Sequence, residues 1–263
     1  MLWAASKIKG YAVAASDGDV GTVSDLLFDD SSWVVRWLVV ETGNWFAGRK
    51  VLLPTSTLGH ADPLLQKFSV KLTRQQVKDS PDVDSERPVS RQIETDLYGH
   101  YGWYPYWGYG GYIGGYGYSY GNFMGSPFLG SGPPEGGEEE ALQAQRGQDD
   151  PHLRSIAAVN GYHIHATDGE IGHIEDVLVE EADWSIRYLI VDTKNWWSGQ
   201  HVLISPRSAR DVSWNDRSID LTVDRKTVKS SPTYNASTTV DRDYEDRFNA
   251  FYSTIGSGDW PRR

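Results

Sequence analysis

The chain has 263 residues, enough for one large or two small domains, with a formal net charge of −11 and no cysteine. The missing cysteines exclude disulfides, thiolate nucleophiles and cysteine-bound metal centres, and the acidic charge disfavours nucleic acid as a partner. No apolar run reaches the length of a signal peptide or a membrane span, so we expect a cytoplasmic protein without a transmembrane segment.

One long internal repeat organises the sequence. Residues 2–101 align with residues 153–252 without a gap, at a constant shift of 151 positions. The match is strongest between 17–48 and 168–199, where Asp, Gly, Trp, Arg and Thr recur in the same places. Self-similarity over this length indicates a duplicated structural unit.

The first copy predicts short strands followed by one helix. Asp17-Gly18 marks a tight turn, and 67–72 predicts a strand. Thr73–Val77 predicts one helical turn that ends before a proline, which completes a first barrel domain over 1–81. Apolar residues then recur at spacings of four and predict an amphipathic helix, placed at 86–98.

Residues 99–152 have a different composition. Tyr98 to Gly130 is nearly all glycine and aromatic residues, and an acidic spacer follows. This composition predicts a Gly/Tyr-rich disordered linker. Two interpretations remain open: a flexible tether, or a segment whose aromatic side chains drive self-association or docking on a partner.

The second copy shows the strand pattern more clearly, in a second barrel domain predicted over 153–235. Asp168-Gly169 between apolar alternations predicts a hairpin. The predicted strands are 162–166, 172–179, 184–192, 201–204 and 218–223. A C-terminal amphipathic helix is predicted over 238–255, where apolar residues recur at spacings of three and four.

The predicted fold is therefore mainly β: two small β-barrels in tandem, each followed by an amphipathic helix. Each helix has an apolar face that a small barrel covers only in part. We therefore predict that the two helices pack on each other or on the opposite barrel, which gives an intramolecular pseudo-dimer. A homo-oligomer is the alternative partner arrangement.

The repeated motif, Gly-Tyr-x-Val, then Asp-Gly-x-x-Gly-x-Val-x-Asp-x-Leu, then Val-Arg-Trp-Leu-Val-Val-Glu-Thr-Gly, resembles the PRC-barrel domain. That domain occurs in the cytoplasmic part of the photosynthetic reaction-centre H subunit and in a ribosome maturation factor. The resemblance covers 2–81 and 153–232, as in bacterial tandem PRC-barrel proteins. It implies a six-stranded or similar barrel used for protein–protein contact, with no catalytic residues or cofactor, and it suggests association with membrane complexes such as those of photosynthesis.

Histidines concentrate in the second copy. His163 and His165 lie two apart on one predicted strand and therefore share a face. His173 and His201 lie on neighbouring predicted strands, and three imidazoles together would suit zinc, nickel or copper. The repeat equivalents are not histidines, so solvated strand residues are the competing interpretation. The alternative function is a ligand- or metal-binding module.

Asp25 with Arg36, and Asp176 with Arg187, recur in both copies. We expect each carboxylate to pair with the guanidinium on the next strand and fix the register. The alternative is that both arginines bind a partner carboxylate or another anion.

Two predicted turns carry adjacent aromatic residues, Trp45-Phe46 and Trp196-Trp197. Successive side chains of an extended segment point to opposite sides, so one aromatic of each pair can close the barrel end while the other faces outward as an anchor. No phosphate loop, nucleophile elbow or zinc-protease motif is present. We therefore expect a non-enzymatic adaptor for other proteins.

Overall fold

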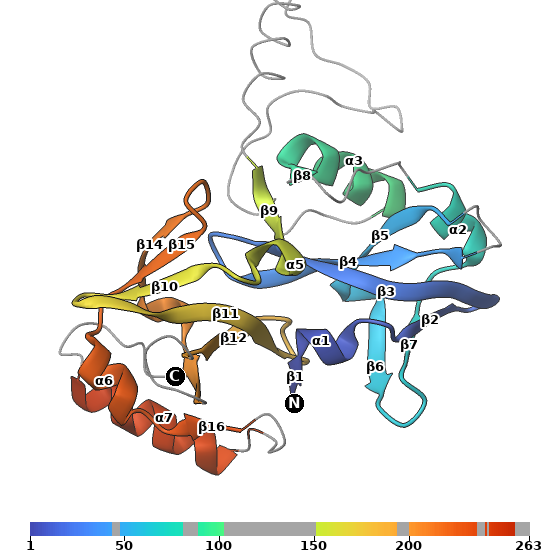
Figure 1. Cartoon of the computed structure of the whole chain (residues 1–263). Helices are drawn as coiled ribbons and strands as arrows, with labels where there is room; N and C mark the ends of the chain where they lie inside the picture. The colour runs from blue at the N-terminus through green and yellow to red at the C-terminus, as the bar shows by residue number, and fades with distance from the viewer. Residues whose placement is uncertain are drawn as a thin grey trace, which may run out of the picture.

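The computed structural model describes residues 1–43, 48–80, 89–102, 151–193, 200–235, 240 and 242–255 (Figure 1). The fold is mainly β, with two sheets of mixed strands and few helices. Most of the predicted linker and the four turn aromatics, Trp45, Phe46, Trp196 and Trp197, lie outside the described residues.

Barrel unit 1 follows the first copy of the repeat. Its strands are β2 (Ala12–Ala15), β3 (Gly18–Asp29), β4 (Val34–Glu41), β5 (Lys50–Pro54), β6 (Leu58–Asp62) and β7 (Lys67–Val70). The short helices η2 (Thr55–Thr57) and α2 (Arg74–Lys78) complete it, and β8 (Val89–Ser90) and α3 (Arg91–Tyr101) follow.

Barrel unit 2 repeats this order. Its strands are β10 (His163–Ala166), β11 (Gly169–Glu180), β12 (Ile186–Asp192), β13 (His201–Ile204), β14 (Ala209–Ser213), β15 (Ser218–Leu221) and β16 (Thr233–Tyr234). The helices are η3 (Pro206–Ser208), α6 (Arg225–Ser230) and α7 (Arg242–Ile255). The predicted strand 201–204 is confirmed residue for residue.

Each unit forms one row of strands that curves back on itself. In unit 1 the hydrogen-bonded order is β5-β4-β3-β2-β7-β6, and in unit 2 it is β13-β12-β11-β10-β15-β14, with β16 added beyond β13. The two ends of the first row, β5 and β6, are consecutive in the chain and are joined by η2. The row therefore closes around its core through a covalent corner.

Glycine allows the close strand contact inside each row. A Cβ atom on Gly21 would lie 2.0 Å from the carbonyl oxygen of Glu41, and one on Gly172 would lie 2.0 Å from that of Asp192. No side chain fits at that distance. This contact explains why both glycines recur in the repeat.

The first strand of each copy joins the sheet of the other unit. β1 (Leu2–Ala4) pairs with β11 of unit 2, with Leu2 opposite Glu180 and Ala4 opposite Leu178. β9 (Pro151–Ser155) pairs with β3 of unit 1, with Leu153 opposite Asp29. Figure 1 shows blue β1 beside the unit 2 strands and yellow β9 above β3. The predicted domain bounds, 1–81 and 153–235, therefore each include a strand that belongs to the other sheet.

A pseudo-twofold axis relates the two units. Val34 forms a β-bridge with Ser185, which is its own equivalent in the repeat. Val35 N donates to the carbonyl of Trp184 at 2.8 Å, and Ile186 N donates to that of Trp33 at 2.7 Å. A contact between equivalent residues, flanked by two equivalent hydrogen bonds, is the mark of a twofold, isologous interface. The units thus associate within one chain.

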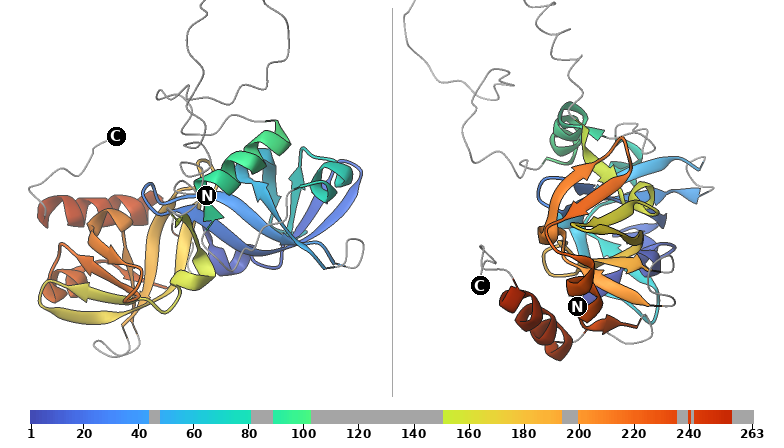
Figure 2. Two further views of the ribbon diagram at one scale, coloured as in Figure 1. Left: turned by 90° about the horizontal axis from the view of Figure 1, so that it is seen from above. Right: turned by 60° about the vertical axis from the view of Figure 1, so that its left-hand side comes forward.

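Both long helices pack on their own units, so the prediction that they pack on each other or on the opposite barrel is wrong. On α3, Tyr98 contacts Trp37 of β4 with ring centroids 5.0 Å apart. On α7, Phe248 contacts Tyr188 of β12 at 4.9 Å. Figure 2 shows the two helices over separate units. Trp37 of β4 and Tyr188 of β12 thus provide each helix with an aromatic contact on its own unit.

The first helix also begins later than the predicted 86–98. It spans Arg91–Tyr101 because Val89 and Ser90 pair with β9 as strand β8. Ser90 then stands directly before the first helical residue, a position where serine is favoured. The C-terminal helix, predicted over 238–255, spans Arg242–Ile255.

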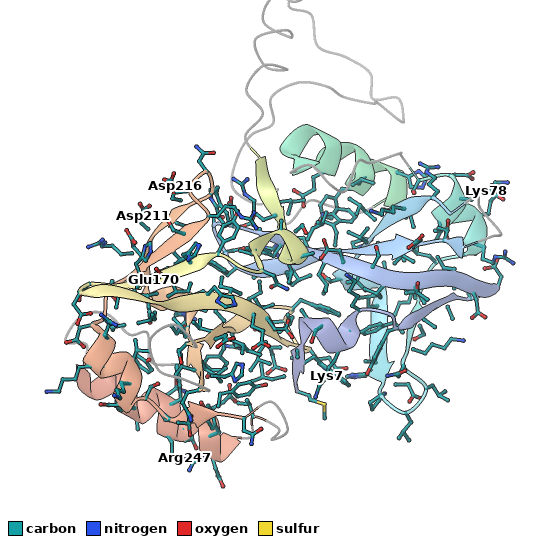
Figure 3. The ribbon with its side chains drawn as sticks, viewed as in Figure 1. Lys7, Lys78, Glu170, Asp211, Asp216 and Arg247 are labelled. Carbon is teal, nitrogen blue, oxygen red and sulfur yellow. The ribbon has the colours of Figure 1, made fainter. Side chains whose placement is uncertain are left out.

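One continuous cluster of buried apolar side chains runs through both units and includes residues from Ala5 to Val228. The short helices α1 (Ala5–Ile8) and α5 (Ile156–Val159), which follow the exchanged strands, contribute to it. Charged side chains such as Glu170, Asp216 and Arg247 surround this core on the outside (Figure 3). The two barrels therefore share this core, and a second cluster, which includes Tyr188 and Phe248, lies between unit 2 and α7.

Candidate interaction site at the junction of the two units

The recurring aspartates lie at the junction and bind the start of the other unit. Asp25 of β3 accepts hydrogen bonds from Ser155 Oγ and from Ala157 N, the latter at 3.2 Å. Asp176 of β11 accepts from Ser6 Oγ at 2.5 Å and from Ser6 N at 3.2 Å. The backbone donors, Ser6 N and Ala157 N, are equivalent positions of the repeat. Each aspartate therefore fixes the short helix that enters from the other unit.

Asp176 is buried, with 8% of its surface exposed. Burial raises the pKa of this carboxyl above its usual value, and the hydrogen bonds from Ser6 and Val177 N oppose that change without cancelling it. The carboxylate is held in place by donors from both units, since Val177 N donates to it at 2.8 Å.

The expected pairing of these aspartates with Arg36 and Arg187 is wrong. In the register of β3 and β4, Leu27 faces Trp37 and Phe28 faces Val35, so Arg36 is the extra residue of a β-bulge. A bulge turns its side chain away from the residue that simple alternation would place opposite it.

Both arginines instead reach back to the turn that precedes their strand. Arg36 donates to Ser32 Oγ at 3.3 Å, and Arg187 donates to Asp183 at 3.1 Å. Ser32 and Asp183 are equivalent positions, so the contact recurs in both units. It stabilises the two turns that meet at the pseudo-twofold axis.

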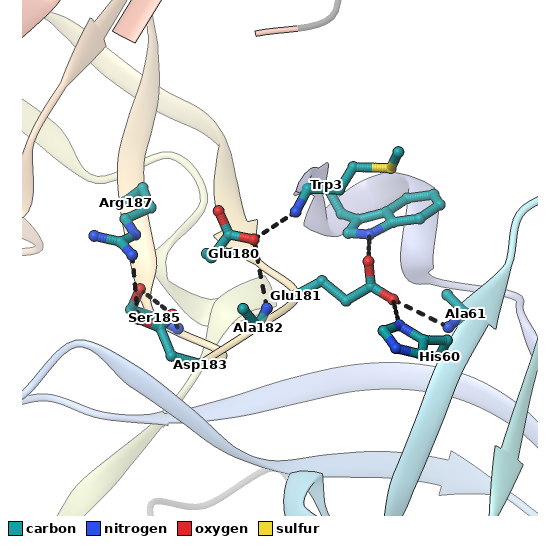
Figure 4. Close-up of polar contacts among 10 residues, drawn as sticks. Trp3, His60, Ala61, Glu180, Glu181, Ala182, Asp183, Ser185 and Arg187 are labelled. Carbon is teal, nitrogen blue, oxygen red and sulfur yellow. Dashed lines mark hydrogen bonds and ion pairs between the residues drawn. The ribbon is translucent and has the colours of Figure 1, made fainter. Parts of the chain in front are cut away.

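Glu181 joins the two units from the turn after β11 (Figure 4). It accepts from Trp3 Nε1 at 3.4 Å and from Ala61 N at 3.3 Å, and it lies 3.0 Å from His60 Nδ1. Burial raises the pKa of Glu181, but the hydrogen bonds from His60, Trp3 and Ala61 outweigh this effect and lower it overall. The neighbouring Glu180 pairs with the amino group of Met1 at 2.5 Å.

The equivalent contact on the other side of the axis is an ion pair. Arg154 of β9 lies 2.9 Å from Asp30, and both side chains are largely buried, at 19% and 16% exposed. Asp30 corresponds to Glu181, and Arg154 corresponds to Trp3. The Arg154 guanidinium also stacks over Trp214 at 4.4 Å. The two halves of the junction therefore have the same geometry and different chemistry.

Aromatic side chains fill the junction between these polar contacts. Trp184 of unit 2 lies against Phe68 of unit 1, with ring centroids 6.0 Å apart. Phe28 of unit 1 lies between Trp33 and Trp214, at 5.3 and 6.5 Å. Trp33 and Trp184 have backbone φ angles of 56° and 58°, in the left-handed region that non-glycine residues rarely adopt. The backbone carbonyls of these two residues accept the hydrogen bonds that flank the axis.

A family model for the PRC-barrel domain matches residues 3–72 and 155–228, which is both repeats and more than half of the chain. The chain belongs to the PRC-barrel family. PRC-barrel domains are usually protein-interaction modules, and the family is generally non-catalytic. The family assignment therefore supports a binding role and points to no reaction.

One relative is an uncharacterized protein of Deinococcus radiodurans, which is 33% identical over 89 residues. These residues are 33% of this chain and 32% of the relative, so the match spans about a third of the relative's length. Among the residues with described positions, no helix is long and apolar enough to cross a membrane.

The four histidines of the second PRC unit each lie on its sheet, but three of them bind different carboxylates. His163 lies 3.0 Å from Glu170, His165 lies 3.3 Å from Asp220, and His201 lies 2.6 Å from Glu175. His173 faces His163 across β10 and β11. Within the described part of the chain, no three His, Asp or Glu side chains are arranged to hold a metal ion.

The described bases of the two aromatic hairpins are built alike. Thr42 Oγ1 donates to the carbonyl of Arg49, and Thr193 Oγ1 donates to that of Gln200, both at 2.8 Å. The hairpin tips lie outside the described residues. The recurring threonines therefore hold the two hairpins at equivalent places on the two PRC units.

The polar contact between helix and sheet is also shared. Trp37 Nε1 donates to Glu94 of α3 at 2.9 Å, and Tyr188 OH donates to Glu245 of α7 at 3.4 Å. Tyr101 of α3 is buried, which raises its pKa to about 12 against the opposing influence of Ser80 and Arg49. These recurring residues hold the helices in place.

Sequence reasoning missed Trp3, Ser6, Asp30, Arg154 and Glu181, which form the junction. For Ser6 and Ser155, the sequence does contain a pattern that could have indicated their shared role. Each lies near the start of its repeat, opposite an alanine in the other copy, so each copy keeps one hydroxyl in this segment.

Proposed function

We propose that this protein is a non-enzymatic adaptor that holds other proteins on the surfaces of its two PRC barrels. The observation that carries the proposal is the reciprocal exchange of β1 and β9. Exchange joins the barrels into one body, so equivalent strands and turns of the two barrels stand in a fixed orientation to each other. A partner with two equivalent sites, or two copies of one partner, fits such a body.

The partner-binding residues that we propose are the hairpin aromatics Trp45, Phe46, Trp196 and Trp197. Several other recurring residues have contacts inside the protein: the aspartates bind the neighbouring unit, the arginines bind turns, and the threonines close the hairpins. Adjacent aromatics in a short turn are suited to anchor a partner. Arg36 and Arg187 bind turn residues, so we assign them to the scaffold.

By family resemblance, the setting that we propose is the cytoplasm beside a membrane complex, of which a photosynthetic reaction centre is one example. The protein would bind such a complex peripherally, at the cytoplasmic surface of the membrane. Neither an enzymatic reaction nor a cofactor is part of this proposal.

Affinity capture from the native cell, followed by mass spectrometry, tests the proposal. The bait is the full chain, compared with the double variant Trp45→Ser, Trp196→Ser. The matched control is Leu64→Ser, Leu65→Ser, which removes two exposed apolar side chains (93% and 70% exposed) from another hairpin. We expect the tryptophan variant to lose a specific partner that the control retains, with both variants folded by circular dichroism. Equal capture by all three baits would contradict the assignment of the hairpins.

A further inference from the structure

The junction of the two units is self-complementary. Each unit supplies the same kind of donor, a short strand with three paired residues followed by one helical turn. Each also supplies the same kind of acceptor, the C-terminal half of a long strand with an aspartate that binds this turn. At the centre Val34 contacts Ser185, its own equivalent. One unit thus contains both halves of a twofold interface, as the subunits of a symmetric dimer do.

The polar contacts at the two ends of this interface differ in their chemistry. Arg154 pairs with Asp30 at one end, and Glu181 binds Trp3 and His60 at the other. If unit 2 paired with another unit 2, Asp211 would take the place of His60 and lie against Glu181. In the same pairing Arg154 would take the place of Trp3 and lie against Glu181 with the opposite charge, so these charges balance and do not select one pairing over the other.

The covalent connection is longer than the separation of the two ends that it joins. β8 stands directly before α3 and pairs with β9, so the two described ends that flank residues 103–150 are separated by about the length of α3. A helix of 11 residues is about 16 Å long. A chain as long as residues 103–150 can span more than about 100 Å when extended, so its length is sufficient to reach a unit of a second copy.

We propose that the junction is a complete docking site for a second PRC unit, and that its natural occupant can come from a second copy of this chain. Unit 1 of one copy binds unit 2 of the other through the same β1 and β9 exchange. In the intact chain the partner unit is covalently attached, so pairing within one chain prevails in dilute solution. Release of the connection removes this advantage. The inference concerns how the units recognise each other and goes beyond the proposed adaptor function.

The experiment uses the full chain with a protease cleavage site inserted between residues 103 and 150. After cleavage, the protein is examined at micromolar concentration by size-exclusion chromatography and native mass spectrometry. Cleaved protein with and without an isotope label is then mixed, unfolded in urea and refolded. We expect the two fragments to stay together after cleavage. After refolding, we expect complexes that combine a labelled fragment with an unlabelled one, at the frequency of statistical mixing.

Charge reversal locates the contact. Arg154→Asp places a carboxylate against Asp30 and is expected to weaken the fragment complex by about tenfold or more. Adding Asp30→Arg is expected to restore most of the affinity. The matched control is Lys67→Asp, which reverses one charge of an exposed pair with Asp19 inside unit 1 and leaves the complex unchanged.

Three results overturn the proposal. The fragments separate or unfold on cleavage, the refolded complexes never combine labelled with unlabelled fragments, or Arg154→Asp leaves the affinity at its original value. Circular dichroism of the uncleaved Arg154→Asp chain distinguishes lost docking from lost folding. A variant that is folded when intact and separates when cleaved supports docking at this site.

Discussion

Asp176 offers a direct way to perturb the junction. Its carboxylate accepts two bonds from Ser6 of the other unit and one from Val177 N. Replacement by alanine leaves three donors without their acceptor, two of which belong to the exchanged segment. Asp176→Ala therefore tests whether this carboxylate holds the segment in place.

The size of the effect follows from two opposing contributions. Hydrogen bonds to a charged acceptor contribute about 1.5–3 kcal/mol each when the donors cannot find water instead. Removing a buried charge offsets part of that loss. We expect Asp176→Ala to lower the free energy of unfolding by about 2–3 kcal/mol and the melting temperature by about 4–12 °C. Asp176→Asn keeps one acceptor oxygen, and we expect a loss of under about 1 kcal/mol.

The pH dependence has a defined sign. Because burial raises the pKa of Asp176 above 3.8, the folded protein keeps a proton that the unfolded chain has already released. The contribution of this group to stability therefore falls as pH rises from 3.8 through the raised value. Asp176→Asn removes that decline, so the variant gains stability relative to the wild type as pH increases across this window.

Urea unfolding followed by tryptophan fluorescence measures these differences. Asp19→Ala is the control, since its carboxylate is 79% exposed and pairs with Lys67 at the surface. A loss below about 0.5 kcal/mol for Asp176→Ala, the size of an ordinary surface substitution, would refute the role assigned to this carboxylate.

Three further outcomes are expected. Glu94→Ala removes the acceptor of the buried Trp37 indole and should lower stability by about 1–3 kcal/mol, with faster hydrogen exchange confined to α3, whereas Glu94→Gln should retain most of it. Gly172→Ala places a Cβ atom 2.0 Å from the carbonyl oxygen of Asp192 and should lower the free energy of unfolding by at least about 3 kcal/mol, measured by thermal unfolding. A variant with an unchanged melting temperature would contradict the close spacing of these strands. The separate carboxylate partners of the unit 2 histidines predict no rise in melting temperature with Zn²⁺, whereas a metal site at 100 times its Kd would add about 2.7 kcal/mol.

The sequence predicted the elements of each unit because turn chemistry and apolar alternation are local. The Asp-Gly turns, the strand 201–204 and the C-terminal helix follow from short stretches of residues. The exchange of β1 and β9 could not follow from such patterns. Leu2 can pair with Asp29 of its own unit or with the equivalent Glu180 of the other unit. Because the sequence is duplicated, the two pairings place similar side chains on the same face of the sheet, and local patterns do not distinguish them.

The expected pairs of aspartate and arginine failed for a related reason. Simple alternation assumes that each residue of a strand pairs with one residue of the neighbouring strand. β4 and β12 break this rule, because each carries an extra, unpaired residue at Arg36 and Arg187. A bulge depends on how the whole sheet curves, and neither arginine has a local feature that indicates it. The recurring aspartates were recognised as important, whereas their partners lay in the other unit.

Disulfide trapping tests the exchanged strand most directly, and the absence of native cysteine makes the assay unambiguous. Ala4 faces Leu178 of the other unit, and the equivalent residue of its own unit is Leu27. The exchanged arrangement predicts that Ala4→Cys with Leu178→Cys forms a disulfide within the monomer on mild oxidation, while Ala4→Cys with Leu27→Cys stays reduced. A disulfide in the second variant and none in the first would show that each barrel keeps its own first strand.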